Sequence, residues 1–123
     1  MNVCTRFHCH HCCMNTSMVL SEEDIQRIEA RGYEQSDFCV ENDGWMQLRN
    51  TEGHCLFLKN NLCTIYSFRP QGCILYPLIF DNETQEVIYD IDCPHPQHFP
   101  MQSKQIRQVI KLVTTILNER AHR

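Results

Sequence analysis

The chain has 123 residues, and its 11 Lys and Arg against 15 Asp and Glu give a formal charge of −4. This length suits one small domain, and the acidic balance excludes the broad basic face that binding to DNA or RNA requires. The unusual feature is a total of nine cysteines beside seven histidines. We therefore expect no nucleic-acid partner. We also expect a modest hydrophobic core that needs an additional source of stability, such as bound metal or disulfides.

The cellular compartment decides what the cysteines do. The segment that begins at Met1 has no apolar run resembling a secretion signal. The longest apolar run, from Cys73 to Phe80, is interrupted by Pro77 and is shorter than the roughly 18 residues that a membrane helix needs. An odd cysteine count also leaves one thiol outside any set of disulfides. We therefore expect a cytoplasmic protein without membrane contact, whose reduced thiols bind metal rather than form disulfides.

The first two elements in chain order are a loop and a helix. Residues 1–19 hold clustered cysteines and histidines without helical or strand periodicity, so we predict a loop shaped by what it binds. A helix follows, because Ser21 is a good N-cap and Asp24 completes a variant of the capping box. Gly32 is a natural C-terminal stop. We interpret this helix as structural and assign no chemistry to it.

The segment of residues 37–99 predicts short antiparallel strands separated by turns. The strand-like stretches are residues 45–48, 55–58, 78–80 and 87–91, and the turns are residues 50–53, 60–61 and 81–84. The last two stretches with their turn indicate a hairpin. Pro70 biases Arg69 away from helical geometry, so any helix between Cys63 and Cys73 is short.

The longest predicted helix comes last. Apolar side chains recur along it at helical spacing, at Ile106, Val109, Ile110, Val113, Ile116 and Leu117. This stripe packs either on the domain's own core or against a protein partner, which includes a second copy of the chain. The candidate partner or homodimer surface is the segment 101–121.

Together these elements predict an α+β fold. We expect a small irregular metal-stapled domain with short antiparallel strands, one helix in its N-terminal half and a long C-terminal helix. Residues 1–99 form the cysteine-cluster metal-binding part. Residues 100–123 form an amphipathic helix packed on it, so the whole chain is a single domain.

The candidate metal ligands are cysteines. Cys9 and Cys12 are three positions apart, and two such thiols on a turn can converge on one metal in zinc and iron–sulfur sites alike. Further thiols reinforce this pair, and the full candidate set is Cys4, Cys9, Cys12, Cys13, Cys55, Cys63, Cys73 and Cys93. Eight thiols suffice for two four-thiolate sites, or for one site with spare residues.

Three details of the cluster leave alternatives open. Adjacent side chains point in different directions, so Cys12 and Cys13 serve two nearby metals, or one of them packs as a small apolar group. His10 and His11 are additional candidate ligands, because zinc accepts mixed Cys/His sets. Arg69 and Lys59 are the candidate cations beside a negatively charged thiolate site, although an ordinary ion pair is the alternative for Arg69.

The motifs resemble those of a known family. The matching stretches are Phe7-x-Cys9-x2-Cys12-Cys13, the run from Gly53 to Leu58, Cys63-Thr64-Ile65-Tyr66-x2-Arg69-Pro70-x2-Cys73-x2-Tyr76-Pro77, and Cys93. In this pattern the chain resembles the CxxCxxCC cysteine-cluster family of zinc- or iron-chelating domains. The resemblance covers residues 4–93, and it implies that the metal ligands are Cys9, Cys12, Cys13, Cys55, Cys63, Cys73 and Cys93.

The chain also departs from the family pattern. Arg6 stands where the name-giving motif has its first cysteine, which leaves the role of Cys4 open. His10 replaces a glycine that is common after the second cysteine, and Cys39 matches no motif position. Cys39 is therefore the candidate for the ninth, unliganded thiol.

The same cysteine cluster occurs in flagellin lysine N-methylase, where it is associated with a [4Fe–4S] centre. This kinship implies that the present chain holds an iron–sulfur cluster, [4Fe–4S], in an electron-transfer or accessory role. One alternative is a structural zinc-binding interaction module. The other is a minimal methyltransferase-like enzyme, against which the sequence shows no glycine-rich cofactor loop and no Cys-x3-Cys-x2-Cys motif.

Overall fold

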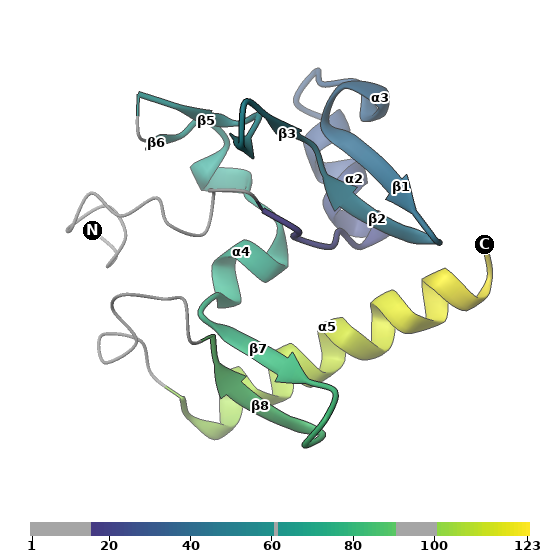
Figure 1. Ribbon diagram of the computed structural model, residues 1–123, viewed down its shortest axis with the longest axis vertical. Helices are drawn as coiled ribbons and strands as arrows, with labels where there is room; N and C mark the ends of the chain where they lie inside the picture. The colour runs from purple at the N-terminus through teal and green to yellow at the C-terminus, as the bar shows by residue number, and fades with distance from the viewer. Residues whose placement is uncertain (1–15, 61, 91–100) are drawn as a thin grey trace.

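The computed structural model describes residues 16–60, 62–90 and 101–123. The described elements are, in chain order, α2 (Glu22–Glu29), α3 (Gln35–Phe38), β1 (Cys39–Asn42), β2 (Trp45–Leu48), β3 (Asn50–Thr51), β4 (His54–Cys55), β5 (Leu58–Lys59), β6 (Leu62–Cys63), η2 (Tyr66–Phe68), α4 (Gln71–Leu75), β7 (Leu78–Asp81), β8 (Glu86–Tyr89) and α5 (Ser103–Ala121). Within these ranges the strands pair as β1–β2, β3–β4, β5–β6 and β7–β8, each pair antiparallel. The predicted α+β fold is confirmed, with its short antiparallel strands and long C-terminal helix (Figure 1).

Helix α2 begins at the predicted capping box. The Ser21 hydroxyl accepts the N–H of Asp24 at 3.1 Å, and a carboxylate oxygen of Asp24 accepts the N–H of Ser21 at 3.1 Å. The chain turns away beyond the helix at Gly32, whose φ of 98° lies in the left-handed region that favours glycine. The predicted start and stop signals of this helix are confirmed.

The β1–β2 hairpin differs from the prediction. Residues 45–48 pair with β1, in which Cys39 lies opposite Leu48, and neither β1 nor α3 was predicted from the sequence. The connecting turn is Asp43-Gly44, with φ values of 52° and 83°. An Asp-Gly pair between two strands is a strong hairpin signal and could have located β1. Helix α3 has only four residues, which is too short to show a helical period.

The predicted turn around residues 81–84 lies between β7 and β8, whereas β3 occupies the first half of the predicted turn 50–53 and the predicted strand 55–58 is divided between β4 and β5. The turn within residues 50–53 joins β3 to β4, two strands of two residues each. Asn60 has a φ of 53° between β5 and β6, which are equally short. The last hairpin has four residues in each arm, with Leu78 opposite Tyr89.

The main hydrophobic core lies between α2, the β1–β2 hairpin and the β3–β4 hairpin. Its buried members are Leu20, Ile25, Ile28, Phe38, Cys39, Leu48, Cys55, Phe57 and Ile65, which we call the core cluster. Aromatic rings meet within it, since the Phe38 and Phe57 ring centroids are 6.1 Å apart. Tyr33 packs edge-on against Phe57 at 5.2 Å. The strands that carry cysteines are therefore anchored on the centre of the fold.

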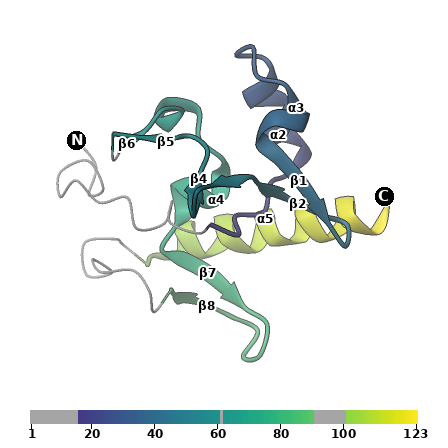
Figure 2. The ribbon, with the colours of Figure 1, turned by 45° about the horizontal axis from the view of Figure 1, so that its top comes forward.

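Helix α5 packs against α4, β7 and β8 (Figure 2), and its buried face overlaps the predicted stripe but is rotated from it around the helix. Its buried residues are Val109, Leu112 and Ile116, and Leu112 was not in the predicted stripe. Ile110 and Leu117 belong to that stripe but are 47% and 48% exposed. Each follows a buried residue by one position, which is about 100° around a helix. A partner or homodimer surface on residues 101–121 stays a prediction.

The C-terminal end of α5 reaches the β1–β2 hairpin and α2. The Arg120 guanidinium donates to the Asp43 carbonyl at 3.0 Å and lies over the Trp45 ring, 4.4 Å from its centroid. A carboxylate oxygen of Glu119 accepts the N–H of Glu22 at 3.0 Å. None of the described helices combines the length and the hydropathy needed to cross a bilayer.

The turn of the β7–β8 hairpin gives a pH-dependent prediction. The Thr84 hydroxyl donates to a carboxylate oxygen of Asp81 at 2.8 Å, and this hydrogen bond lowers the pKa of that carboxyl. A pKa lowered on folding adds stability above the ordinary aspartate pKa of about 4, and the contribution is lost as the pH falls through the folded value. We expect Thr84→Val to raise the Asp81 pKa, as followed by NMR titration. An unchanged pKa would contradict this assignment.

Candidate metal centre

Three of the predicted metal ligands lie on described elements. Cys55 ends β4 and is 3% exposed, whereas Cys63 at the end of β6 and Cys73 in α4 are half-buried. Cys55 is a member of the core cluster, and both other thiols pack against the same cluster. Three separate elements thus place cysteines at one apolar core.

The other predicted ligands lie outside the described residues. They are Cys4, Cys9, Cys12, Cys13 and Cys93, together with the additional candidates His10 and His11. Within residues 16–60, 62–90 and 101–123, no group of three or more His, Cys, Asp or Glu side chains is arranged to hold a metal ion. The complete ligand set therefore stays a prediction.

The residues that follow Cys63 fix the chain near that thiol. The backbone N–H and the hydroxyl of Thr64 both donate to the Phe57 carbonyl, at 2.8 and 2.9 Å. Ile65 is 1% exposed in the core cluster. These contacts hold the base of the β5–β6 hairpin against the core and explain the Thr-Ile pair of the motif.

The Arg-Pro pair of the motif also has a local structural role. The Arg69 guanidinium donates to the Tyr66 carbonyl at 2.7 Å and lies over the Tyr66 ring, 4.0 Å from its centroid. Pro70 is fully buried. Lys59 is exposed on β5. Arg69 thus closes the turn that contains η2, and the predicted effect of either cation on a thiolate site stays a prediction.

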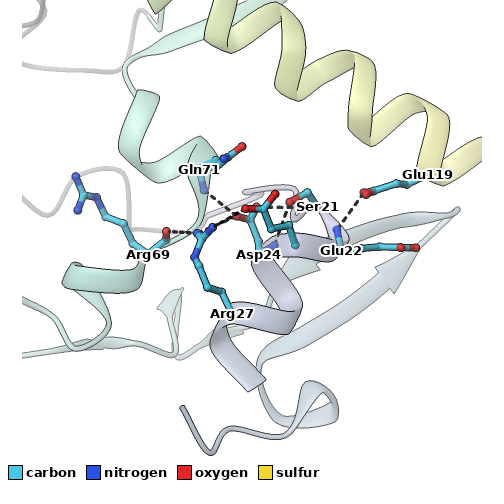
Figure 3. A network of polar contacts seen from close by, with 8 residues as sticks. Ser21, Glu22, Asp24, Arg27, Arg69, Gln71 and Glu119 are labelled. Atoms are coloured by element: carbon cyan, nitrogen blue, oxygen red, sulfur yellow. Dashed lines mark hydrogen bonds and ion pairs between the residues drawn. The ribbon is translucent and has the colours of Figure 1, made fainter. Parts of the chain in front are cut away.

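Asp24 contacts this same motif segment, which the sequence analysis missed. Its side chain is fully buried, and oxygen Oδ1 accepts the N–H of Gln71 at 3.0 Å and Nη2 of Arg27 at 3.1 Å. The same Arg27 nitrogen donates to the Arg69 carbonyl at 2.8 Å. Figure 3 shows these contacts joining α2 to the start of α4. The capping-box pattern predicted the local role of Asp24. No local pattern predicted its hydrogen bond with Gln71, which is 47 residues away in the sequence.

Cys39 is also a buried member of the core cluster, on strand β1. It faces Leu48 across the β1–β2 hairpin and is 7% exposed. Burial raises the pKa of the Cys39 thiol above its ordinary range, which disfavours the thiolate form. Metals bind the thiolate, and this environment therefore suits the predicted unliganded ninth cysteine.

His54 lies next to a candidate ligand in the sequence. Its Nδ1 is 2.9 Å from the carbonyl oxygen of Cys55, within hydrogen-bonding distance. The ring is half-buried. This contact orients the imidazole along the backbone of β4.

Comparison with known proteins adds the family. A family model described as "CxxCxxCC: Putative zinc- or iron-chelating domain" matches residues 3–94. The chain is 25% identical over 114 residues to "Uncharacterized protein MJ0939" of Methanocaldococcus jannaschii, a match that covers 86% of this chain and 41% of that relative. The chain thus spans about two fifths of the length of the curated relative it matches. No solved structure matches it. Since the family model covers most of the sequence, the chain belongs to the CxxCxxCC family of zinc- or iron-chelating cysteine-cluster domains.

Proposed function

We propose that this chain holds a [4Fe–4S] cluster through its clustered cysteines and works in electron transfer or as an accessory to a partner protein. The observation that carries the proposal is the placement of Cys55, Cys63 and Cys73 at one core cluster. All three cysteines lie within residues 3–94, which the family model matches. In the cytoplasmic location that we expect, cysteines stay reduced and are available to metal.

The described residues fit such a group chemically. Iron–sulfur clusters are held by cysteine thiolates, and their potentials depend on solvent exposure and on hydrogen bonds to sulfur. Around Cys55, Phe57 is 2% and Ile65 is 1% exposed, so water is excluded from this side of the thiol. When bound, the cluster supplies one-electron redox chemistry, and the protein supplies a dry apolar shell.

In this proposal some ligands lie on elements that the structure describes, and the others lie outside the described residues. The described elements contribute Cys55, Cys63 and Cys73. The other members of the set are Cys4, Cys9, Cys12, Cys13 and Cys93. Such a set draws its ligands from positions far apart in the sequence, from Cys4 to Cys93.

Metal analysis of the wild-type protein tests the proposal. The chain is purified without oxygen, and its iron, acid-labile sulfide and zinc are measured together with the visible spectrum. We expect brown protein with broad visible absorption and about four iron and four sulfide per cluster. Colourless protein with stoichiometric zinc would contradict the iron–sulfur proposal and indicate a structural zinc site instead.

A further inference from the structure

We infer that Asp24 is a positioning residue for the metal site, because it fixes the backbone segment that presents Cys73. The inference rests on the proposed function, since it concerns one of the proposed ligands. It assigns a role in metal binding to α2 (Glu22–Glu29), an element that carries no cysteine.

Asp24 and Arg27 together hold both sides of the buried Pro70. On one side the Asp24 carboxylate accepts the N–H of Gln71 at 3.0 Å. On the other side Arg27 donates to the Arg69 carbonyl at 2.8 Å, and the same nitrogen contacts Asp24 at 3.1 Å (Figure 3). The segment is thus clamped at the residue before and the residue after the proline.

We call these contacts of Asp24 and Arg27 with residues 69 and 71 the clamp. A further hydrogen bond connects the clamped segment to Cys73. The Pro70 carbonyl accepts the N–H of Cys73 at 3.0 Å, so clamping Pro70 places the cysteine backbone. One residue earlier, Gly72 packs so closely on Met18 that a Cβ there would collide with the Met18 sulfur. Met18 therefore packs against this side of α4, and the hydrogen bonds to residues 69 and 71 hold the backbone from which the Cys73 side chain projects.

Capping α2 does not by itself account for a buried carboxylate at this position. The capping box uses only Oδ2 of Asp24, which accepts the N–H of Ser21, whereas Oδ1 faces the motif segment. Burying a carboxylate is costly unless charge and hydrogen bonds compensate it. Arg27, one turn further along α2, supplies the charge, and the Gln71 N–H supplies a hydrogen bond from the segment that leads to Cys73.

The test compares Asp24→Asn with Ser21→Ala. The first variant removes the negative charge that pairs with Arg27 and leaves one acceptor oxygen, so the donors of Ser21, Gln71 and Arg27 can no longer all be satisfied. The second variant removes the hydroxyl that caps α2 and leaves the contacts of Asp24 with Gln71 and Arg27 in place. Ser21→Ala therefore controls for weakening of the helix start.

The measured quantity is the rate at which protein-bound iron or zinc passes to an excess of chelator, followed by elemental analysis of the protein fraction. Loss of a supporting group around a metal site costs about 10–100-fold in affinity, so we expect release from Asp24→Asn to be at least about tenfold faster than from the wild type. Ser21→Ala is expected to release metal at close to the wild-type rate. Should Asp24→Asn fail to fold, Arg27→Gln takes its place, because Arg27 is one-third exposed and its loss removes the contact with Arg69.

The two ideas fail in different ways. Equal release rates for the wild type, Ser21→Ala and the clamp variant would overturn the positioning role and leave the proposed function standing. Equal acceleration in Ser21→Ala and the clamp variant would also overturn it, because both would then act through general loss of stability. A wild-type protein without bound metal would overturn the proposed function and the inference together.

Discussion

We expect Cys55→Ser to lose bound metal and most of its folded structure. Structural zinc sites contribute on the order of 10–16 kcal/mol to folding, which is comparable to the whole net stability of a domain, about 5–15 kcal/mol. A lost ligand therefore removes a large share of the stability. The checks are metal stoichiometry by elemental analysis and folded structure by circular dichroism.

Cys39→Ser is the matched control for that variant. Cys39 and Cys55 are both buried members of the core cluster, 7% and 3% exposed, and the substitution is the same. Both variants bury a new hydroxyl, at a cost of about 1–3 kcal/mol. We expect Cys39→Ser to keep its full metal content. Equal metal content in the two variants would contradict the assignment of Cys55 as a ligand.

The second large effect is expected for the core itself. Phe38 is fully buried between α2 and the β1–β2 hairpin, and truncation of a buried phenylalanine to alanine costs about 3–5 kcal/mol. We expect Phe38→Ala to lower the free energy of unfolding by this amount, as measured by urea denaturation. Its metal content is expected to be unchanged, because Phe38 supplies no ligand.

Val40→Ala serves as the control for the core variant. Val40 lies on the adjacent strand and is 38% exposed, so its truncation is expected to change stability by no more than about 0.5 kcal/mol. A Phe38→Ala protein that folds but binds no metal would contradict the expectation that Phe38 contributes to stability and not to metal binding.

Local sequence signals predicted the elements whose causes are local. The capping box at Ser21 and Asp24 needs only two residues in one turn of helix, and the structure contains it as predicted. The β7–β8 hairpin likewise follows from two short apolar stretches on either side of a polar turn. The Asp43-Gly44 turn was an equally local signal that the sequence analysis did not use.

Non-local contacts could not be predicted in this way. The partner of Asp24 is Gln71, and nothing in the local pattern of either residue requires the other. The buried face of α5 depends on where β7 and α4 lie, which is why Leu112 is buried and Ile110 is exposed. Motif resemblance named Cys55, Cys63 and Cys73 as ligands, but only the fold places them at one core.

The central claim is that sulfur–metal bonds hold this chain in its folded shape. The most direct measurement is circular dichroism of the wild-type protein before and after exhaustive treatment with a strong chelator, with metal content determined on the same samples. The account predicts stoichiometric metal before treatment, and loss of metal and folded structure together afterwards. Protein that is free of metal and keeps an unchanged spectrum and a cooperative unfolding transition would contradict it.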